Sequence, residues 1–460
     1  MFIRTVETRS GGKTHRYLRV VENYRDDGKI KQRVLWNLGN LEKIRHKLPG
    51  LAKSLGNHSG VPLVSLRELK SEGVREYGNM LLLRTLWKGL GIEEIFSRDK
   101  TAERMRPYIM AVAFHRLLNP RGLPPITEWL DRVYLPELEG PSRSGRARLA
   151  GRILRLFEYL ERDGKGRGLR VISKTTRKKS VPFCFMIKLK MNALAVRGSR
   201  LRQKESLLVI LTAGGVPRAY GIYDGKSPLA FMHDVLTDDG LVRGLKGRKT
   251  VFVANRSTIG DGVTDLFNRE GIPYIVFINR WSKKGVRKPL YKVGRGYVAQ
   301  RIKTSRKKGP RVYILSKKAQ ESSRTKRHVE CALKTNMTNR AFLAKAVKAR
   351  RECLHLEEFF GNITPPAGVL SRVEYKRGYT FICFLTYLLA RTLDRGLSQA
   401  GMGRKLTPLG LLEMLKDIKL VTNVVSGRRL NYVTKIPTQT RRLLRAFGVK
   451  NPRTFPTLSW

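Results

Sequence analysis

The stretch KTVFVANRSTIGDGVTDLFNREGIPYIVFIN, residues 249–279, predicts a strand, a helix and a second strand. An apolar run ends at Ala254-Asn255-Arg256, a segment with helical spacing follows, and another apolar run begins at Tyr274. Strand, helix and strand in this order form a crossover that leaves the two strands parallel in one sheet. In an α/β enzyme the end of such a strand is where a catalytic carboxylate is expected, yet Asn255 carries an amide.

Three apolar, β-rich runs precede this crossover: VPFCFMIKL at 181–189, SLLVILTAGG at 206–215 and PRAYGIYDG at 217–225. Short polar or glycine turns separate them, and Ser227-Pro228 then provides the N-cap and first turn of a helix. Three strands that pair as hairpins, followed by crossovers, predict a mixed sheet of the ribonuclease H type. A doubly wound fold would instead alternate strand and helix from its start.

Other segments flank this sheet and predict a multidomain α/β chain of the α+β kind. Residues 1–40 alternate apolar and basic residues around Gly11-Gly12 and Asp27-Gly28, which predicts a β-hairpin meander. Helical apolar spacing runs from about Leu66 to Leu160. The predicted regions are a β-hairpin module with linker at 1–62, a helical DNA-docking domain at 63–165, an RNase H-like domain at 166–395 and a basic C-terminal tail at 396–460.

A basic β-rich insertion is predicted at 281–318, inside the third of these regions. No acidic residue occurs between Glu270 and Glu321, and Tyr, Val and Ile alternate there with Lys and Arg. The pattern predicts β-hairpins with a positive face, either a solvated insertion or, as we favour, a DNA-facing platform. Basic runs beside the sheet supply the candidate phosphate contacts: Lys178, Lys179, Lys283, Lys284, Arg287, Lys288, Arg306, Lys307 and Lys308.

Charge points to a polyanionic partner. The chain has 93 Lys and Arg against 36 Asp and Glu, a net charge of +57 over 460 residues, which favours nucleic acid. The basic residues are spread along the whole chain, which argues against a membrane surface. The longest apolar run, 379–390, is too short to cross a bilayer, and the N-terminus lacks an export signal. Four cysteines without CxxC spacing fit a reducing cytoplasm.

Several segments, taken in order, resemble an insertion-sequence transposase of the DDE type with a β-rich insertion before its glutamate. They are MFIRTVETRSGGKTHRYLRVVENYRDDGKIKQRVLWNLGNL, FHRLLNPRGLPPITEWLDRVYLPEL, GVPRAYGIYDGKSP, VFVANRSTIGDGVTDLFNREGIPYIV, HLEEFFGNI and FICFLTYLLAR. The similarity extends from the first residues to about residue 395. It implies binding of double-stranded transposon-end and target DNA, and a homodimer or larger synaptic complex.

The resemblance also implies a catalytic site. Three carboxylates would hold two Mg²⁺ or Mn²⁺ ions that activate the nucleophile and stabilise the leaving oxygen in phosphodiester cleavage and strand transfer. The first Asp belongs near Phe185 or Met186, where no acid stands, and the second at Asn255. The Glu corresponds to Glu357, the one family metal ligand present. In the Tyr-x2-Arg-x3-Glu-x6-Lys signature around it, the other three positions hold Arg350, Cys353 and Thr364.

Because two of the three carboxylates are missing, we expect phosphoryl transfer to be severely impaired. An amide is a weaker metal ligand than a carboxylate. A non-catalytic DNA-binding protein derived from a transposase is the alternative, and an RNA-binding structural protein is a third class. Four other acids have two interpretations, as ligands of a relocated metal site or as ordinary turn and helix-end residues: Glu205, Asp224, Asp261 and Asp265. Glu357 could be a solvated ion-pair residue, and Trp281 either a base-stacking or a core residue.

Overall fold

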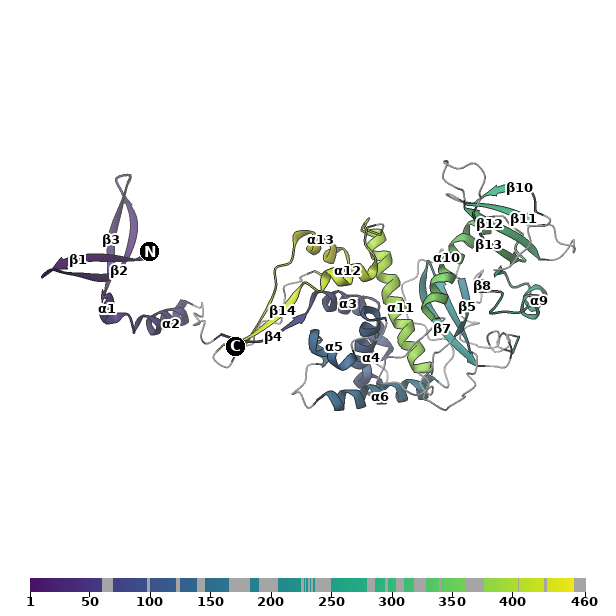
Figure 1. Ribbon diagram of the computed structural model, residues 1–460, viewed down its shortest axis with the longest axis horizontal. Coiled ribbons are helices and arrows are strands. Elements are labelled where there is room, and N and C mark those ends of the chain that lie inside the picture. The colour runs from purple at the N-terminus through teal and green to yellow at the C-terminus, as the bar shows by residue number, and fades with distance from the viewer. Residues whose placement is uncertain are drawn as a thin grey trace. The chain divides into compact units, whose positions relative to one another are not determined.

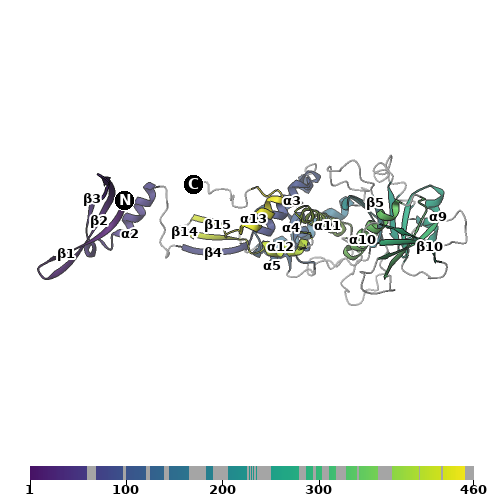
Figure 2. The ribbon, with the colours of Figure 1, turned by 90° about the horizontal axis from the view of Figure 1, so that it is seen from above.

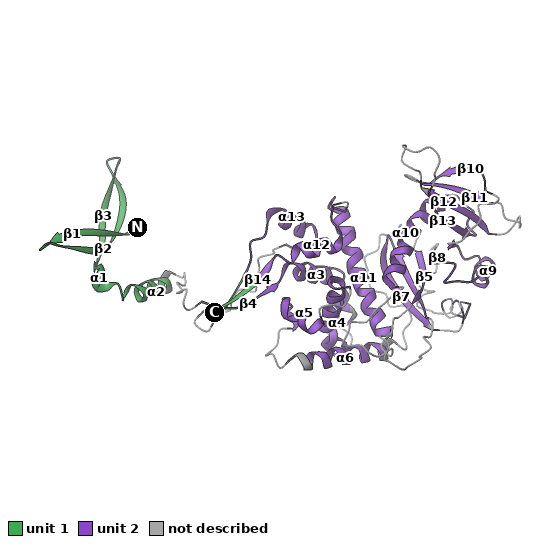
Figure 3. Ribbon diagram, viewed as in Figure 1, with its two compact units in different colours: residues 1–73, 421–432, 458–460 green, residues 74–420, 433–457 purple. Residues whose placement is uncertain are grey.

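The structure is a computed structural model that describes most of the chain. Two compact units are distinguished in Figure 3: residues 1–73, 421–432 and 458–460, and residues 74–420 and 433–457. The described residues are 1–59, 69–96, 100–120, 125–138, 145–164, 183–189, 206–224, 227, 229–230, 232, 235, 250–278, 286–293, 297–302, 310–317, 328–338, 341–360, 376–403, 405–425 and 428–450.

The first unit begins with an antiparallel meander of three strands, β1 (Phe2–Ser10), β2 (Lys13–Asp26) and β3 (Lys29–Asn40). Its turns lie at Gly11-Gly12 and Asp27-Gly28, and all four residues have positive φ. Turns of this kind match the twist of the strands they join, which explains the glycines. Helices α1 (Leu41–Ile44) and α2 (Leu48–Ser59) follow, and the Asn40 side chain accepts a hydrogen bond from the Glu42 amide at the start of α1. The predicted meander is confirmed (Figure 1).

The second unit contains a layer of helices built around α11 (Lys376–Gln399). The central part of α11, from Tyr379 to Leu389, is almost entirely buried, as its apolar run predicts. Helix α11 contacts α3, α4, α6 and strand β7. The other elements of this layer are α3 (Gly78–Gly89), η1 (Ile92–Ile95), α4 (Lys100–Leu118), α5 (Ile126–Arg132), η2 (Pro136–Leu138) and α6 (Gly145–Gly164).

Beside this layer lies a nine-stranded mixed sheet with the order β10-β11-β12-β13-β9-β8-β5-β6-β7. Strands β5, β6 and β7 pair antiparallel, whereas β5, β8 and β9 are parallel. The Ser227 hydroxyl accepts a hydrogen bond from the Ala230 amide, as predicted for an N-cap. The bounds are β5 (Phe183–Leu189), β6 (Ser206–Ala213), β7 (Val216–Asp224), β8 (Val251–Asn255), α9 (Asp261–Arg269) and β9 (Tyr274–Ile278).

The predicted β-rich insertion does form strands: β10 (Val286–Lys292), β11 (Tyr297–Ile302) and β12 (Arg311–Lys317). They continue the sheet as an antiparallel meander. A further strand, β13 (His328–Thr335), joins this meander to β9 and was not predicted from the sequence. The described part of the insertion is therefore an extension of the sheet edge, and Tyr297, Val298 and Ala299 of β11 are buried.

Different helices cover the two faces of the sheet, as Figure 2 shows for α9 and α10 (Phe342–Phe360). On one face, Phe185 and Val253 belong to the large core that also holds Ala346, Cys353 and Leu356 of α10. On the other face, alternate residues of the same strands form a smaller cluster with α9, whose members include Cys184, Met186, Ala254, Val263 and Phe267. This alternation decides which residues of β5 and β8 can approach α10.

Two parts of the domain prediction are wrong. Leu69–Glu76 forms β4, so the helical region does not begin at residue 66, and the predicted C-terminal tail is folded. Strand β4 joins a three-stranded sheet of order β15-β14-β4 with strands from the far end of the chain, a pairing that local periodicity cannot reveal. The C-terminal elements are α12 (Pro408–Leu415), β14 (Lys419–Val425), β15 (Arg428–Val433) and α13 (Thr438–Ala446).

The packing of the C-terminal region on α11 can be tested at Gly396. A Cβ built there would overlap Cε1 of Phe447, which directly follows α13. We expect Gly396→Ala to lower the free energy of unfolding by about 1–3 kcal/mol, since the ring has to move. Gly89→Ala is the matched control: nothing lies within 4 Å of its Cβ, and the change should be neutral or stabilising by about 0.5–1 kcal/mol. Equal midpoints of denaturant unfolding for the two variants would contradict this packing.

Within the ranges described above, no helix combines the length and the apolar character needed to cross a bilayer.

Candidate functional site

Asn255 is the last residue of β8, a strand whose five residues are all buried. Its side chain is 4% exposed and lies on the face covered by α10. The chain turns directly after it, because the backbone carbonyl of Asn255 accepts a hydrogen bond from the Thr258 amide at 2.9 Å. The amide is therefore fixed at the carboxyl end of a central parallel strand, where α/β enzymes place catalytic groups.

Helix α10 brings two further side chains to Asn255. The amide nitrogen of Asn255 donates a hydrogen bond to Oε1 of Glu357. The guanidinium of Arg350 donates from Nη1 to Oδ1 of Asn255 at 3.0 Å. Arg350 and Glu357 lie two helical turns apart and therefore on the same flank of α10. The Arg350 guanidinium also lies over the Phe277 ring, 5.1 Å from its centroid. The amide of Asn255 thus links a carboxylate to a guanidinium.

The environment of Glu357 acts on its acidity in both directions. Burial raises the pKa of the Glu357 carboxyl above its usual value. The hydrogen bond from Asn255 and the positive charge of Arg350 oppose this effect without cancelling it. The carboxyl is therefore in an environment that disfavours its ionised form, even though a cation lies nearby.

The structure brings Asn255 and Glu357 together but does not bring Met186 to them. Met186 is fully buried on the other face of the sheet, in the cluster beneath α9. The parallel register pairs Met186 with Ala254, so its continuation places Ile187 beside Asn255. Ile187 and Phe185 belong to the core on the α10 side. The position for a first carboxylate that faces Asn255 is therefore Ile187, with Phe185 one pleat away.

These residues do not fit a pair of divalent cations as they stand. The donor set consists of one carboxylate and one carboxamide, and the amide oxygen is already engaged by Arg350. Mg²⁺ and Mn²⁺ prefer several oxygen ligands with negative charge. Among the described residues, no group of three or more His, Cys, Asp or Glu side chains is arranged to hold a metal ion.

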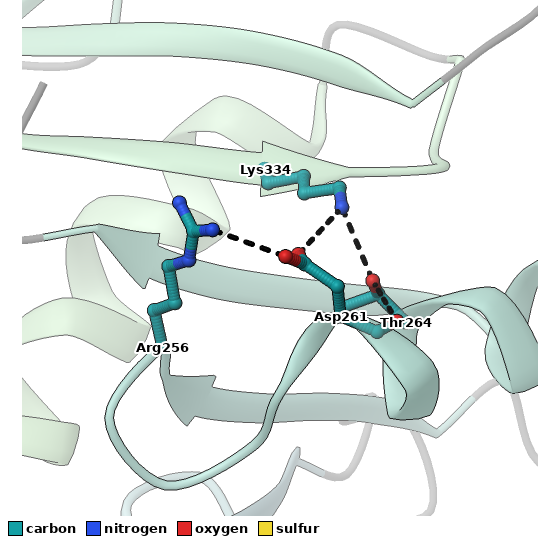
Figure 4. A network of polar contacts seen from close by, with 4 residues as sticks. All are labelled: Arg256, Asp261, Thr264 and Lys334. Atoms are coloured by element: carbon teal, nitrogen blue, oxygen red, sulfur yellow. Dashed lines mark hydrogen bonds and ion pairs between the residues drawn. The ribbon is translucent and has the colours of Figure 1, made fainter.

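Asp261, a candidate replacement ligand, is engaged elsewhere (Figure 4). Its carboxylate accepts a hydrogen bond from Arg256 at 3.0 Å. It also forms an ion pair with Lys334 at 3.4 Å. Lys334 also donates to the Thr264 hydroxyl at 3.1 Å. Burial raises the pKa of Asp261, but Lys334 and Arg256 outweigh it, so the pKa is lowered overall. Asp261 lies in the first turn of α9, where its negative charge interacts favourably with the helix dipole. Helix α9 covers the opposite face of the sheet from the one that carries Glu357.

Most of the predicted DNA contacts lie outside the described residues, as do Glu205 and Trp281. This applies to Lys178, Lys179, Lys283, Lys284, Arg306, Lys307 and Lys308. Arg287 and Lys288 belong to β10, and only the backbone of these two residues is described. The site residue that sequence reasoning missed is Arg350, noted only as a departure from the signature tyrosine. Its seven-residue spacing from Glu357 on one helix was the available signal.

Comparison with known proteins adds information on the first unit. Residues 3–61 match the model of a family described as IS1634 family transposase, N-terminal domain. No curated protein matches the chain significantly. The matched segment covers the meander β1–β3 with helices α1 and α2. The chain therefore carries, at residues 3–61, the N-terminal domain of an insertion-sequence transposase, as the opening segment of the sequence predicts.

Proposed function

We propose that the whole chain is a DNA transposase of an insertion sequence, built on an RNase H-like domain for metal-dependent strand cleavage and transfer. The observation that carries this proposal is the meeting of Glu357 and Asn255 at the end of β8. The strand order β7-β6-β5-β8-β9, with three antiparallel strands and two parallel ones, supports the RNase H-like part. The N-terminal match supports the transposase part.

The partner in this proposal is double-stranded DNA, in the cytoplasm at the nucleoid, bound by a homodimer or larger synaptic complex. A net charge of +57 supplies the attraction to phosphates. The exposed surface of the meander supports a role in docking the ends: Trp36 is 61% exposed and Ile3 is 60% exposed on a sheet rich in Arg and Lys. Aromatic and basic side chains together favour contact with bases and phosphates.

In this proposal, phosphoryl transfer is impaired. Metal ions, when bound, would activate the nucleophile and stabilise the leaving oxygen. In this chain Arg350 supplies positive charge to Asn255, and Asn255 in turn donates to Glu357. The alternative function is that of a protein that acts through DNA binding alone, in competition with active transposases for the same ends. Restoring the carboxylates separates the two possibilities, as the Discussion describes.

End recognition tests the proposed function directly. We expect the full-length protein to bind duplexes from the two ends of its encoding element more tightly than shuffled duplexes of equal length. Specific protein–DNA binding typically exceeds non-specific binding by about 10³-fold or more. Fluorescence anisotropy with labelled duplexes, at several salt concentrations, measures the ratio. Tighter binding to RNA of the same sequence, or no binding of duplex DNA at low salt, would contradict the proposal.

A further inference from the structure

The C-terminal region contains a helix with a strongly basic exposed face. Residues 418–460 include nine Lys and Arg and no Asp or Glu. Within this stretch, α13 begins directly after Pro437 and lies at the margin of the helical layer (Figure 1). Part of the positive charge that the sequence predicts for a tail is therefore carried by a folded helix.

One side of α13 packs against the core of the second unit. Leu444 is 1% exposed, and Thr440 is also buried. Leu443 is partly buried against the same core. Just past the helix, Phe447 lies against Gly396 of α11. The leucines of α13 are therefore occupied, and they are not available for a lipid bilayer, as those of an amphipathic membrane helix would be.

The opposite side of α13 is open to solvent. Its exposed residues are Thr438, Gln439, Arg442, Arg445 and Ala446. At 3.6 residues per turn they span an arc of about one third of the helix circumference, with Arg442 near its centre. The long side chains of Gln439, Arg442 and Arg445 stand beside short ones, which leaves room for a partner to approach the helix closely.

The protein itself does not neutralise the arginines of this face. Arg442 and Arg445 form no ion pair or hydrogen bond with any part of the chain that the structure describes. By contrast, Lys416, just after α12, pairs with Glu413 at 2.8 Å. Arg442 and Arg445 are three residues apart, a spacing at which like charges on a helix repel each other. An anionic partner on this face would relieve the repulsion.

The dimensions and side chains of this face fit the major groove of duplex DNA. A helix of nine residues is about 13.5 Å long, and the groove is about 12 Å wide and admits one helix. Gln pairs there with adenine and Arg with guanine, each through two hydrogen bonds. Gln439 and Arg442 are three residues apart and therefore neighbours on the helix surface, so that both can reach neighbouring base pairs.

We propose that α13 is a DNA-recognition helix that enters the major groove, with Gln439 contacting an adenine and Arg442 a guanine at a neighbouring base pair. Arg445 contacts a backbone phosphate beside the groove. This inference rests on the proposed function, since it requires duplex DNA as the partner, and it adds a sequence-reading element in the second unit. An acidic protein would be attracted by the same arginines but would leave Gln439 without a role.

Selection from a library of randomised DNA duplexes by the full-length protein tests the proposal. The bound duplexes are expected to share a motif with an adenine and a guanine at neighbouring base pairs. Gln439→Ala should relax the preference for the adenine, and Arg442→Ala the preference for the guanine. Each should weaken binding of the selected duplex by about 5–150-fold, as the loss of a two-point base contact does.

The phosphate contact has a different signature. Arg445→Ala should weaken binding of the selected duplex and of unrelated duplexes to the same extent. It should also reduce the slope of log affinity against log salt by about one, since one phosphate contact is lost. Anisotropy titrations of both duplexes at several salt concentrations measure the two effects.

Two controls separate a DNA contact from a structural role. Arg132→Ala removes an exposed arginine of α5 that lies 4.0 Å from Glu128, and it should leave the motif, the affinity and the salt slope unchanged. Thermal unfolding of all four variants should stay close to that of the wild type, because each of the changed side chains is exposed.

The proposal is overturned by an unchanged motif in either Gln439→Ala or Arg442→Ala, or by losses of affinity in these variants that are equal for every duplex. Unchanged affinity in all three α13 variants would assign this face to another partner, such as an acidic protein, and would leave the proposed function standing. If the wild type binds no duplex at low salt, the proposed function itself fails. The selection starts from random DNA and therefore requires no knowledge of the ends of the element.

Discussion

The double variant Ile187→Asp with Asn255→Asp is expected to bind Mn²⁺ and to nick duplex DNA, and the wild type is expected to do neither. Both positions face α10 at adjacent points of β5 and β8, and Glu357 already contacts residue 255. Three carboxylates at this edge would restore the donors that a pair of divalent cations needs. Thermal unfolding with and without Mn²⁺ measures metal binding, since a ligand at about 100 times its Kd stabilises by about 2.7 kcal/mol.

Arg350 determines how complete this gain can be. Its guanidinium donates to the oxygen of residue 255, and an aspartate there would form an ion pair that competes with a metal ion. Adding Arg350→Tyr, which introduces the signature residue, should therefore increase Mn²⁺ affinity and nicking further. The stability of each variant has to be measured as well, because an aspartate at Ile187 replaces a side chain that is 1% exposed.

Met186→Asp with Asn255→Asp is the matched control. It adds the same two carboxylates, but Met186 packs beneath α9 on the other face of the sheet. This variant should gain neither Mn²⁺ stabilisation nor nicking. Equal activity in both double variants would refute the assignment of faces. Strong Mg²⁺-dependent nicking by the wild type would refute the impairment itself. Failure of the Ile187 variants, if they remain folded, would favour a protein that acts through DNA binding alone.

Local signals were sufficient for much of the fold. The turns at Gly11-Gly12 and Asp27-Gly28 have the residues that positive φ requires, so the first meander was predictable. The same is true of β8, α9 and β9, where apolar runs flank an amphipathic helix. The joining of β4 to β14 and β15 in one sheet was not predictable, because these strands come from the far end of the chain; the contact of Glu72 in β4 with Arg429 in β15 spans 357 positions.

The candidate site was predictable in part for a similar reason. Asn255 and Glu357 are 102 residues apart, and only the resemblance to transposases linked them before the structure did. The face of β5 could not be chosen, because FCFMIKL is buried on both sides and shows no alternation that separates Met186 from Ile187.

Duplex affinity should fall steeply with salt. With a net charge of +57, the protein is expected to neutralise several phosphates, and each contact releases condensed counterions. For about six to ten contacts, binding weakens by about 10³–10⁵-fold between 50 and 200 mM salt. Anisotropy titrations at five or more salt concentrations give the slope of log affinity against log salt.

Single variants then locate the contacts. Arg301 is exposed on β11 in the basic insertion, so Arg301→Gln should reduce the slope by about one if this edge faces DNA. Lys416→Gln is the matched control, because Lys416 already pairs with Glu413 at 2.8 Å and should contribute little. An unchanged slope in Arg301→Gln would remove the described part of the insertion from the DNA interface. Affinity that stays flat with salt would mean that phosphate contacts do not drive binding, and the excess charge would then require a partner other than DNA.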